Sequence, residues 1–150
     1  MTRSTARQIA VQLMFSLDGD SDSVDEVMSD FFEEGHYASL REEDDLYQEE
    51  PDETQLKYIA SLLKRTVEYL PEIDKRIIQY SDGWKINRIN RPTLAILRCA
   101  VCEVCYMDEI PDSAAVNEAV ELGKKFDSPK AAAFINGILG SIIRAEKPTS

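Results

Sequence analysis

Apolar residues recur at spacings of three and four along most of the chain, and alternation with a period of two is almost absent. This pattern is typical of amphipathic helices, because positions three and four apart lie on one helix face. The sequence therefore predicts an all-α fold of about seven helices in two small packed bundles. We expect a single domain over 1–150, with an N-terminal helical half over 3–80 and a C-terminal helical half over 82–147.

Capping residues indicate where several of these helices begin. Asp52 followed by Gln55 resembles a capping box, and Ser128 before a proline is typical of a helix start. Asp112 or Ser113 is expected to cap the sixth helix. The predicted helices span about 4–17, 23–38, 52–70, 71–80, 94–106, 112–126 and 129–147.

Charge is distributed very unevenly. The chain has 17 Lys and Arg against 28 Asp and Glu, a net charge of −11, which taken as a whole opposes nucleic-acid binding. However, 16 of the acids and only Arg41 among the basic residues lie in 18–54, so this acidic insertion carries −15 and the remainder +4. Within it, 40–50 has only Leu46 and Tyr47 as large apolar residues after Leu40, and we expect a mobile, solvated loop.

Candidate catalytic and metal-binding side chains are few. His36 is the only histidine. Cys99, Cys102 and Cys105 lie on one predicted helix, where the first and third are about 120° apart, so core packing is the favoured interpretation. The chain has no phosphate-binding loop motif and no apolar run of about 18 residues. We expect that the chain is not an enzyme and binds no metal or cofactor. We also expect that it has no membrane segment and is located in the cytoplasm.

Two stretches favour recognition of phosphates. Arg3, Thr5 and Arg7 place cations and a hydroxyl at the start of the first helix, where backbone N–H groups also favour anions. Lys130 lies at the start of the last helix and offers a second contact, although lysines near a helix junction also have purely structural explanations. Phe15 has two interpretations, as a platform that stacks on an unpaired base or as a core aromatic.

Several helix-specific motifs resemble one known family. They are 89–98 (INRPTLAILR), 106–111 (YMDEIP), 115–126 (AVNEAVELGKKF), 134–139 (FINGIL) and, in the first helix, 5–15 (TARQIAVQLMF). In order and spacing they resemble the NusB family of bacterial transcription antitermination factors. The resemblance covers all but the acidic segment and the last few residues, and it implies a NusB-like fold of two small helical bundles.

The resemblance also implies a function without catalysis. Members of the family bind boxA, a short single-stranded RNA element, together with NusE, a small-subunit ribosomal protein. They help to modify RNA polymerase for antitermination, notably on ribosomal RNA operons. The RNA-binding role is carried over to Arg3, Thr5, Arg7, Gln12, Phe15 and Lys130, and the NusE-binding role to Glu103, Tyr106 and Glu118. Asn117, Asn136 and Gly137 are expected to be structural, with Gly137 allowing close helix contact.

Two alternatives stay open at this point. The chain fits a protein-only helical interaction module whose acidic segment docks a basic partner. It also fits a helper domain of an RNA methyltransferase acting in trans, because a similar domain precedes the catalytic domain of some RNA cytosine methyltransferases. A homodimer that masks the basic edge is a further open question.

Overall fold

The computed structural model describes residues 1–17, 22–41, 43–83 and 85–147, and every regular element in these ranges is a helix. The α-helices are α1 (Arg3–Met14), α2 (Asp22–Phe31), α3 (Glu34–Leu40), α4 (Glu53–Glu68), α5 (Leu70–Gln79), α6 (Arg91–Tyr106), α7 (Asp112–Phe126) and α8 (Pro129–Glu146). Two short 3₁₀ turns are η1 (Asp45–Tyr47) and η2 (Ile86–Arg88). The all-α prediction is confirmed.

The helix expected over 23–38 is in fact two helices. At Glu33 the backbone leaves the helical region, with φ −56° and ψ 134°, and α3 begins at the next residue. Gly35 and His36, near the expected end of that helix, therefore lie inside α3. This break raises the number of α-helices within the described ranges from the predicted seven to eight.

The chain forms two compact units, Met1–Glu68 and Tyr69–Ser150. The sequence predicts a division near residue 81, whereas in the structure the division falls between Glu68 and Tyr69. The two differ because the sequence pattern does not reveal which helices α5 packs against. In the structure α5 packs against α6. Arg98 on α6 also donates from Nε and Nη2 to the two carboxylate oxygens of Asp74 on α5, at 2.9 and 2.8 Å. These contacts place α5 in the second unit.

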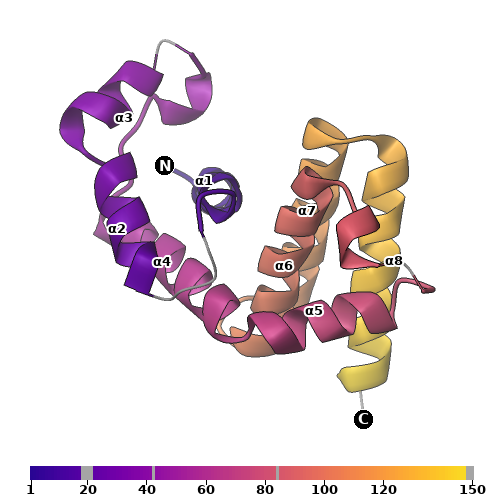
Figure 1. Cartoon of the computed structure of the whole chain (residues 1–150). Coiled ribbons are helices and arrows are strands. Elements are labelled where there is room, and N and C mark those ends of the chain that lie inside the picture. Colours follow the sequence, from indigo (N-terminus) through magenta and orange to yellow (C-terminus); the bar gives the residue numbers. More distant parts are fainter. Residues whose placement is uncertain (18–21, 42, 84, 148–150) are drawn as a thin grey trace. The chain divides into compact units, whose positions relative to one another are not determined.

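In the first unit, α1 and α2 both pack against α4 (Figure 1). Local capping begins two of these helices. The hydroxyl oxygen of Thr2 accepts from the backbone N–H of Thr5 at 3.1 Å, and Asp52 accepts from the N–H of Gln55 at 2.8 Å, as the sequence predicts for α4. Apolar side chains from all three helices form the core: Ala6, Ile9, Ala10, Leu13, Val24, Ile59, Leu62 and Leu63.

The expectation of a mobile loop over 40–50 is wrong for the residues that the structure describes. Tyr47 is buried and belongs to an aromatic cluster with Phe31, Phe32 and Tyr37, whose ring centres lie between 5.0 and 6.0 Å apart. The backbone is also held, because Arg41 Nε donates to the carbonyl of Tyr47 at 3.2 Å. One buried aromatic side chain, Tyr47, thus anchors a segment whose composition is typical of a solvated loop.

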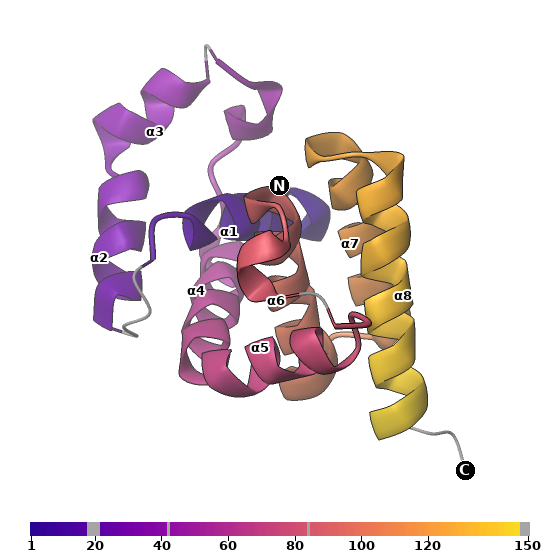
Figure 2. The same ribbon diagram turned by 45° about the vertical axis from the view of Figure 1, so that its right-hand side comes forward.

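In the second unit, α6 is the central element and packs against α5, α7 and α8 (Figure 2). The predicted cap at Ser128 is confirmed, since its hydroxyl accepts from the N–H of Ala131 at 3.0 Å. The cap predicted at Asp112 or Ser113 is wrong: Pro111 is the N-cap of α7, and Asp112 lies in the first turn. An acidic residue there still favours the helix, because it complements the helix dipole.

α7 and α8 pack closely at Gly123. A Cβ added there would lie 2.7 Å from Cδ1 of Ile135 and 3.2 Å from Cα of Ala132. Gly137, expected to allow close helix contact, has nothing within 4 Å of such an atom, and Asn117 and Asn136 are exposed. Among the described residues, no helix is long and apolar enough to cross a bilayer.

Candidate nucleic-acid interface

The start of α1 forms a small cationic edge. Thr2 is the N-cap, and its hydroxyl donates to that of Thr5 at 3.1 Å. Arg3 is the first helical residue, and the first turn of α1 contains no acidic side chain. The positive end of the helix dipole favours an anion at such a position. We call Arg3 and Thr5 the N-terminal edge.

Arg3 is held in place by α4. Its guanidinium carbon lies 4.1 Å from the centre of the Tyr58 ring, and its Nε donates to Oε1 of Gln55 at 3.3 Å. A cation over an aromatic face is stabilised by about 0.5–1 kcal/mol when exposed and by about 2 kcal/mol when desolvated. Arg3 is therefore a preorganised cation with part of its surface open to solvent.

Tyr58 is a residue that the sequence analysis missed. Its ring is buried, and Arg7 also lies over it, with the guanidinium carbon 5.6 Å from the ring centre. Nothing in the local pattern of α4 indicates that a tyrosine there meets two arginines of another helix, since the contact depends on how α1 packs against α4.

The structure places Arg7 differently from the sequence expectation of an exposed phosphate contact. Only 4 % of Arg7 is exposed, because it lies one turn beyond Arg3 among residues that are buried. Of the two arginines at this helix start, Arg3 is the one with accessible surface.

Gln12 and Phe15 occupy the other end of α1. Phe15 is the C-cap residue and is 42 % exposed, so the alternative of a core aromatic is wrong. Gln12 is half-buried, and its Oε1 accepts a hydrogen bond from the hydroxyl of Tyr47. Arg3, Thr5, Gln12 and Phe15 thus all lie on α1 and keep exposed surface in the first unit.

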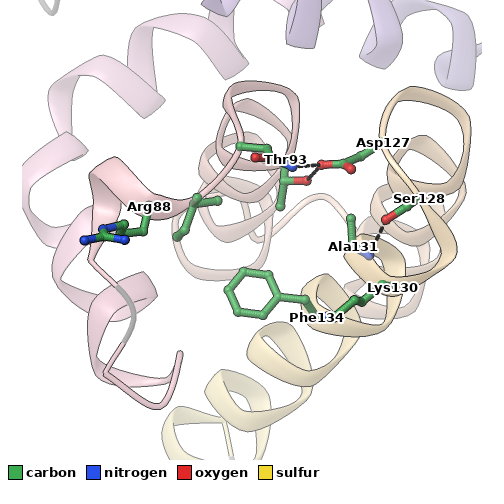
Figure 3. Close-up of a pocket in the computed structure, with 9 residues that line it drawn as sticks. Arg88, Thr93, Asp127, Ser128, Lys130, Ala131 and Phe134 are labelled. Atoms are coloured by element: carbon green, nitrogen blue, oxygen red, sulfur yellow. Dashed lines mark hydrogen bonds between the residues drawn. The ribbon is translucent and has the colours of Figure 1, made fainter.

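A second candidate site is a pocket of about 250 Å³ in the second unit, between the starts of α6 and α8 (Figure 3). Its basic lining residues are Lys130, predicted from the sequence, and Arg88, which the sequence analysis missed. Phe134 projects into the space between them (Figure 3). The pocket therefore combines two cations, an aromatic ring and a helix N-terminus.

Asp127 is a fixed carboxylate in the wall of this pocket. Its Oδ2 accepts from the hydroxyl of Thr93 at 2.6 Å and from Nδ2 of Asn90 at 3.1 Å. These two hydrogen bonds stabilise the charged form and lower the pKa of Asp127 below its ordinary value. The carboxylate also ties the start of α6 to the end of α7, which fixes the shape of the pocket.

The residues expected to bind a protein partner have different environments. Glu103 is buried on α6 with 1 % of its surface exposed, and Glu118 is half-buried on α7. Tyr106 stacks on Tyr69 with ring centres 4.0 Å apart, and its hydroxyl accepts from Nη1 of Arg76 at 2.5 Å. Glu118 and Tyr106 keep accessible surface, whereas Glu103 does not.

The three cysteines belong to the interior of α6. Cys99 and Cys102 are buried, and Cys105 is half-buried. Within the part of the chain that the structure describes, no group of three or more His, Cys, Asp or Glu side chains is arranged to hold a metal ion. In its described residues the chain is thus an all-helical protein with cations and aromatic rings at two helix starts.

Comparison with known proteins identifies the family. The NusB family model matches residues 4–144. The transcription antitermination protein NusB of Natranaerobius thermophilus is 39 % identical over 144 residues, which cover 95 % of this chain and 94 % of that protein. NusB of Acetivibrio thermocellus is 36 % identical over 146 residues, which cover 97 % of this chain and 91 % of that protein. The chain belongs to the NusB family of transcription antitermination proteins, which are not enzymes.

A solved structure has the same fold. It is described as antitermination factors NusB and NusE in complex with dsRNA, and it aligns with a TM-score of 0.72 at 23 % identity. The alignment covers 95 % of this chain and 96 % of that one. The family model and the relatives confirm the family resemblance predicted from the sequence, and this solved structure confirms the NusB-like helical fold.

Proposed function

We propose that this chain binds boxA-type single-stranded RNA together with NusE, and that the complex modifies RNA polymerase for antitermination, notably on ribosomal RNA operons. In this proposal the protein acts in the cytoplasm. Family membership supports the proposal, as does the structural neighbour that contains NusB, NusE and RNA.

The observation that carries the RNA-binding part is the placement of Arg3 over Tyr58 at the start of α1. A fixed guanidinium at the positive end of a helix dipole binds phosphate oxygens with little loss of side-chain entropy. Thr5 adds a hydroxyl, and Phe15 offers an exposed ring on which a base can stack. In this proposal Arg7 acts from within the unit, as a second cation on the Tyr58 ring.

Lys130 is the proposed RNA contact in the second unit, where Arg88 and Phe134 line the same pocket. Arg3 and Lys130 belong to different units, so their use by one RNA strand is part of the proposal. For NusE, the proposed contacts are Tyr106 and Glu118, and Glu103 contributes from its buried position.

The test is electrophoretic retardation of boxA RNA with and without purified NusE, repeated over a series of salt concentrations. We expect a ternary complex whose affinity falls as salt rises, because bound phosphates release counterions. Arg3→Ala should weaken the complex by about 1–3 kcal/mol, as for a charge-assisted contact. Lys75→Ala, which removes an exposed cation from α5, is the matched control.

Retention of RNA that is unchanged in Arg3→Ala would remove the N-terminal edge from the site. Binding of NusE that is insensitive to RNA, with no RNA retained at low salt, would instead favour a protein-only interaction module. Sedimentation of the free protein at the same concentrations shows whether a homodimer competes with these partners.

A further inference from the structure

The acidic insertion contains one segment that lies against α1. Residues 43–50, which we call the acidic turn, carry five exposed carboxylates, namely Glu43, Asp44, Asp45, Glu49 and Glu50. Of these, Glu50 forms an ion pair with Arg41 at 3.4 Å, and Glu49 forms one with the α-amino group of Met1 at 2.5 Å. The turn is a dense negative surface next to the cationic start of α1.

The acidic turn is held in a defined position. Tyr47 lies under it, buried at 8 % exposure, with its ring centre 5.7 Å from that of Tyr37. The hydroxyl of Tyr37 donates in turn to the carbonyl of Glu49 at 2.7 Å. Gln48 Nε2 donates to the carbonyl of Arg41 at 3.0 Å, which closes the segment on itself. These contacts give the carboxylates a fixed place.

The turn contacts the residues to which RNA binding is assigned. The hydroxyl of Tyr47 donates to Oε1 of Gln12 and so occupies that acceptor. A cavity of about 180 Å³ has Met1, Thr2 and Thr5 on one side and residues of the acidic turn, including Asp45 and Glu49, on the other. Residues of the acidic turn and Thr5 of the N-terminal edge therefore line one small cavity within the first unit.

This arrangement opposes RNA binding in two ways. The positive charge of Arg3 attracts phosphates, whereas the carboxylates of the acidic turn repel them. This repulsion is screened over about 10 Å at 0.1 M salt. A strand that reads Gln12 must also replace the hydrogen bond from Tyr47. Both effects weaken the binding of every RNA strand. An unrelated strand makes fewer other contacts with the protein, so these effects reduce its binding the most.

We propose that the acidic turn is a selectivity element: it competes with RNA phosphates for the N-terminal edge, so that unrelated strands are rejected and boxA-type RNA is retained. This inference rests on the proposed RNA-binding function of α1. It assigns a role to residues 43–50 of the acidic insertion, and it predicts that removing negative charges from the acidic turn increases RNA binding.

The experiment compares two sets of three substitutions that change net charge equally. The turn variant is Asp45→Asn, Glu49→Gln and Glu50→Gln, and the control variant is Glu26→Gln, Asp30→Asn and Glu68→Gln, all exposed positions on α2 and α4. Each protein is titrated at low salt with boxA RNA and with an unrelated single strand of equal length, in the presence of NusE. Thermal melting by circular dichroism confirms that each variant is folded.

We expect the turn variant to bind the unrelated strand about three- to tenfold more tightly than the unmodified protein, as for the removal of three screened charges. Its gain for boxA RNA should be smaller, so that the ratio of the two affinities falls. Tyr47→Phe, which removes only the hydroxyl that occupies Gln12, should raise the affinity for both strands.

Equal gains in the turn and control variants would show that total charge matters and would overturn the inference. Unchanged binding in the turn variant would overturn it as well. Arg3→Ala separates this result from failure of the proposed function: RNA that binds the unmodified protein and is lost in Arg3→Ala shows that the edge is used. Absence of RNA binding in every protein, with and without NusE, would overturn both proposals.

Discussion

Arg3 and Tyr58 form a cation–π pair that joins α1 to α4, with 4.1 Å between the guanidinium carbon and the ring centre. The pair makes the first cation of the helix part of the packed structure. An arginine at a chain terminus is otherwise flexible, and binding then costs the entropy of ordering its side chain.

The first prediction concerns Tyr58 as a positioning residue. Tyr58→Leu should weaken boxA RNA binding about two- to tenfold, as for the loss of a partly desolvated cation–π contact, and Tyr58→Phe should retain the affinity. In the Arg3→Ala background, Tyr58→Leu should have little further effect on RNA affinity, since the accessible cation that it positions is absent and only the buried Arg7 remains over the ring. Fluorescence titration of the four proteins forms a double-mutant cycle, and additive losses would contradict the positioning role.

The second prediction concerns the exposed ring of Phe15. Phe15→Ala should reduce RNA affinity by about 1–3 kcal/mol, the range for stacking of one base, and should change the melting temperature little. Ile78→Ala is the control, because Ile78 is a large apolar side chain of similar exposure, 46 %, in the other unit. A drop in melting temperature without a loss of RNA affinity would identify Phe15 as a structural residue.

The third prediction concerns pH. Hydrogen bonds from Thr93 and Asn90 lower the pKa of Asp127 in the folded state, so its charged form stabilises the fold at pH values above its unfolded pKa of about 4. This stabilisation is lost as the pH falls through the lowered pKa. The difference in unfolding free energy between the unmodified protein and Asp127→Asn should therefore shrink as the pH is lowered from about 5 towards 2. Urea titrations at several pH values measure it.

Asp108→Asn provides the reference for that series, since Asp108 is an exposed carboxylate outside this hydrogen-bond network. A stability difference for Asp127→Asn that is constant with pH would show that the two hydrogen bonds do not depend on the charge.

The fourth prediction concerns two glycines on neighbouring helices. Gly123→Ala should destabilise the protein by about 1–3 kcal/mol, because its Cβ would lie 2.7 Å from a side-chain atom and 3.2 Å from the backbone of α8. Gly137→Ala should instead stabilise it by about 0.5–1 kcal/mol, since the added atom meets open space and alanine favours a helix interior. Urea unfolding of both variants checks the prediction, and equal effects at the two positions would contradict it.

Local features of the fold were predictable from the sequence. The caps at Asp52 and Ser128 depend on residues three positions away, and both were correctly identified. The predicted cap of α7 lies one or two residues beyond the observed one, because Pro111 and Asp112 are both suitable neighbours of a helix start. The break at Glu33 was missed because the apolar spacing continues through it into α3.

Features that depend on contacts between distant segments were not predictable. Tyr47 is buried only because Phe31 and Tyr37 surround it, so composition alone suggested a mobile loop. Tyr58, Arg88 and Phe134 likewise became visible as candidate site residues only through packing. A single sequence shows which residues are present but does not show which of them contact one another in the fold.

The location of the cysteines provides a built-in chemical reporter. All three thiols, Cys99, Cys102 and Cys105, lie on α6, and residues 1–68 contain no cysteine. A thiol reacts as its thiolate and only when a reagent reaches it, and burial raises the pKa of Cys105. Alkylation of Cys99 and Cys102 in native buffer therefore requires α6 to open, and its rate measures the opening of the second unit without interference from the first.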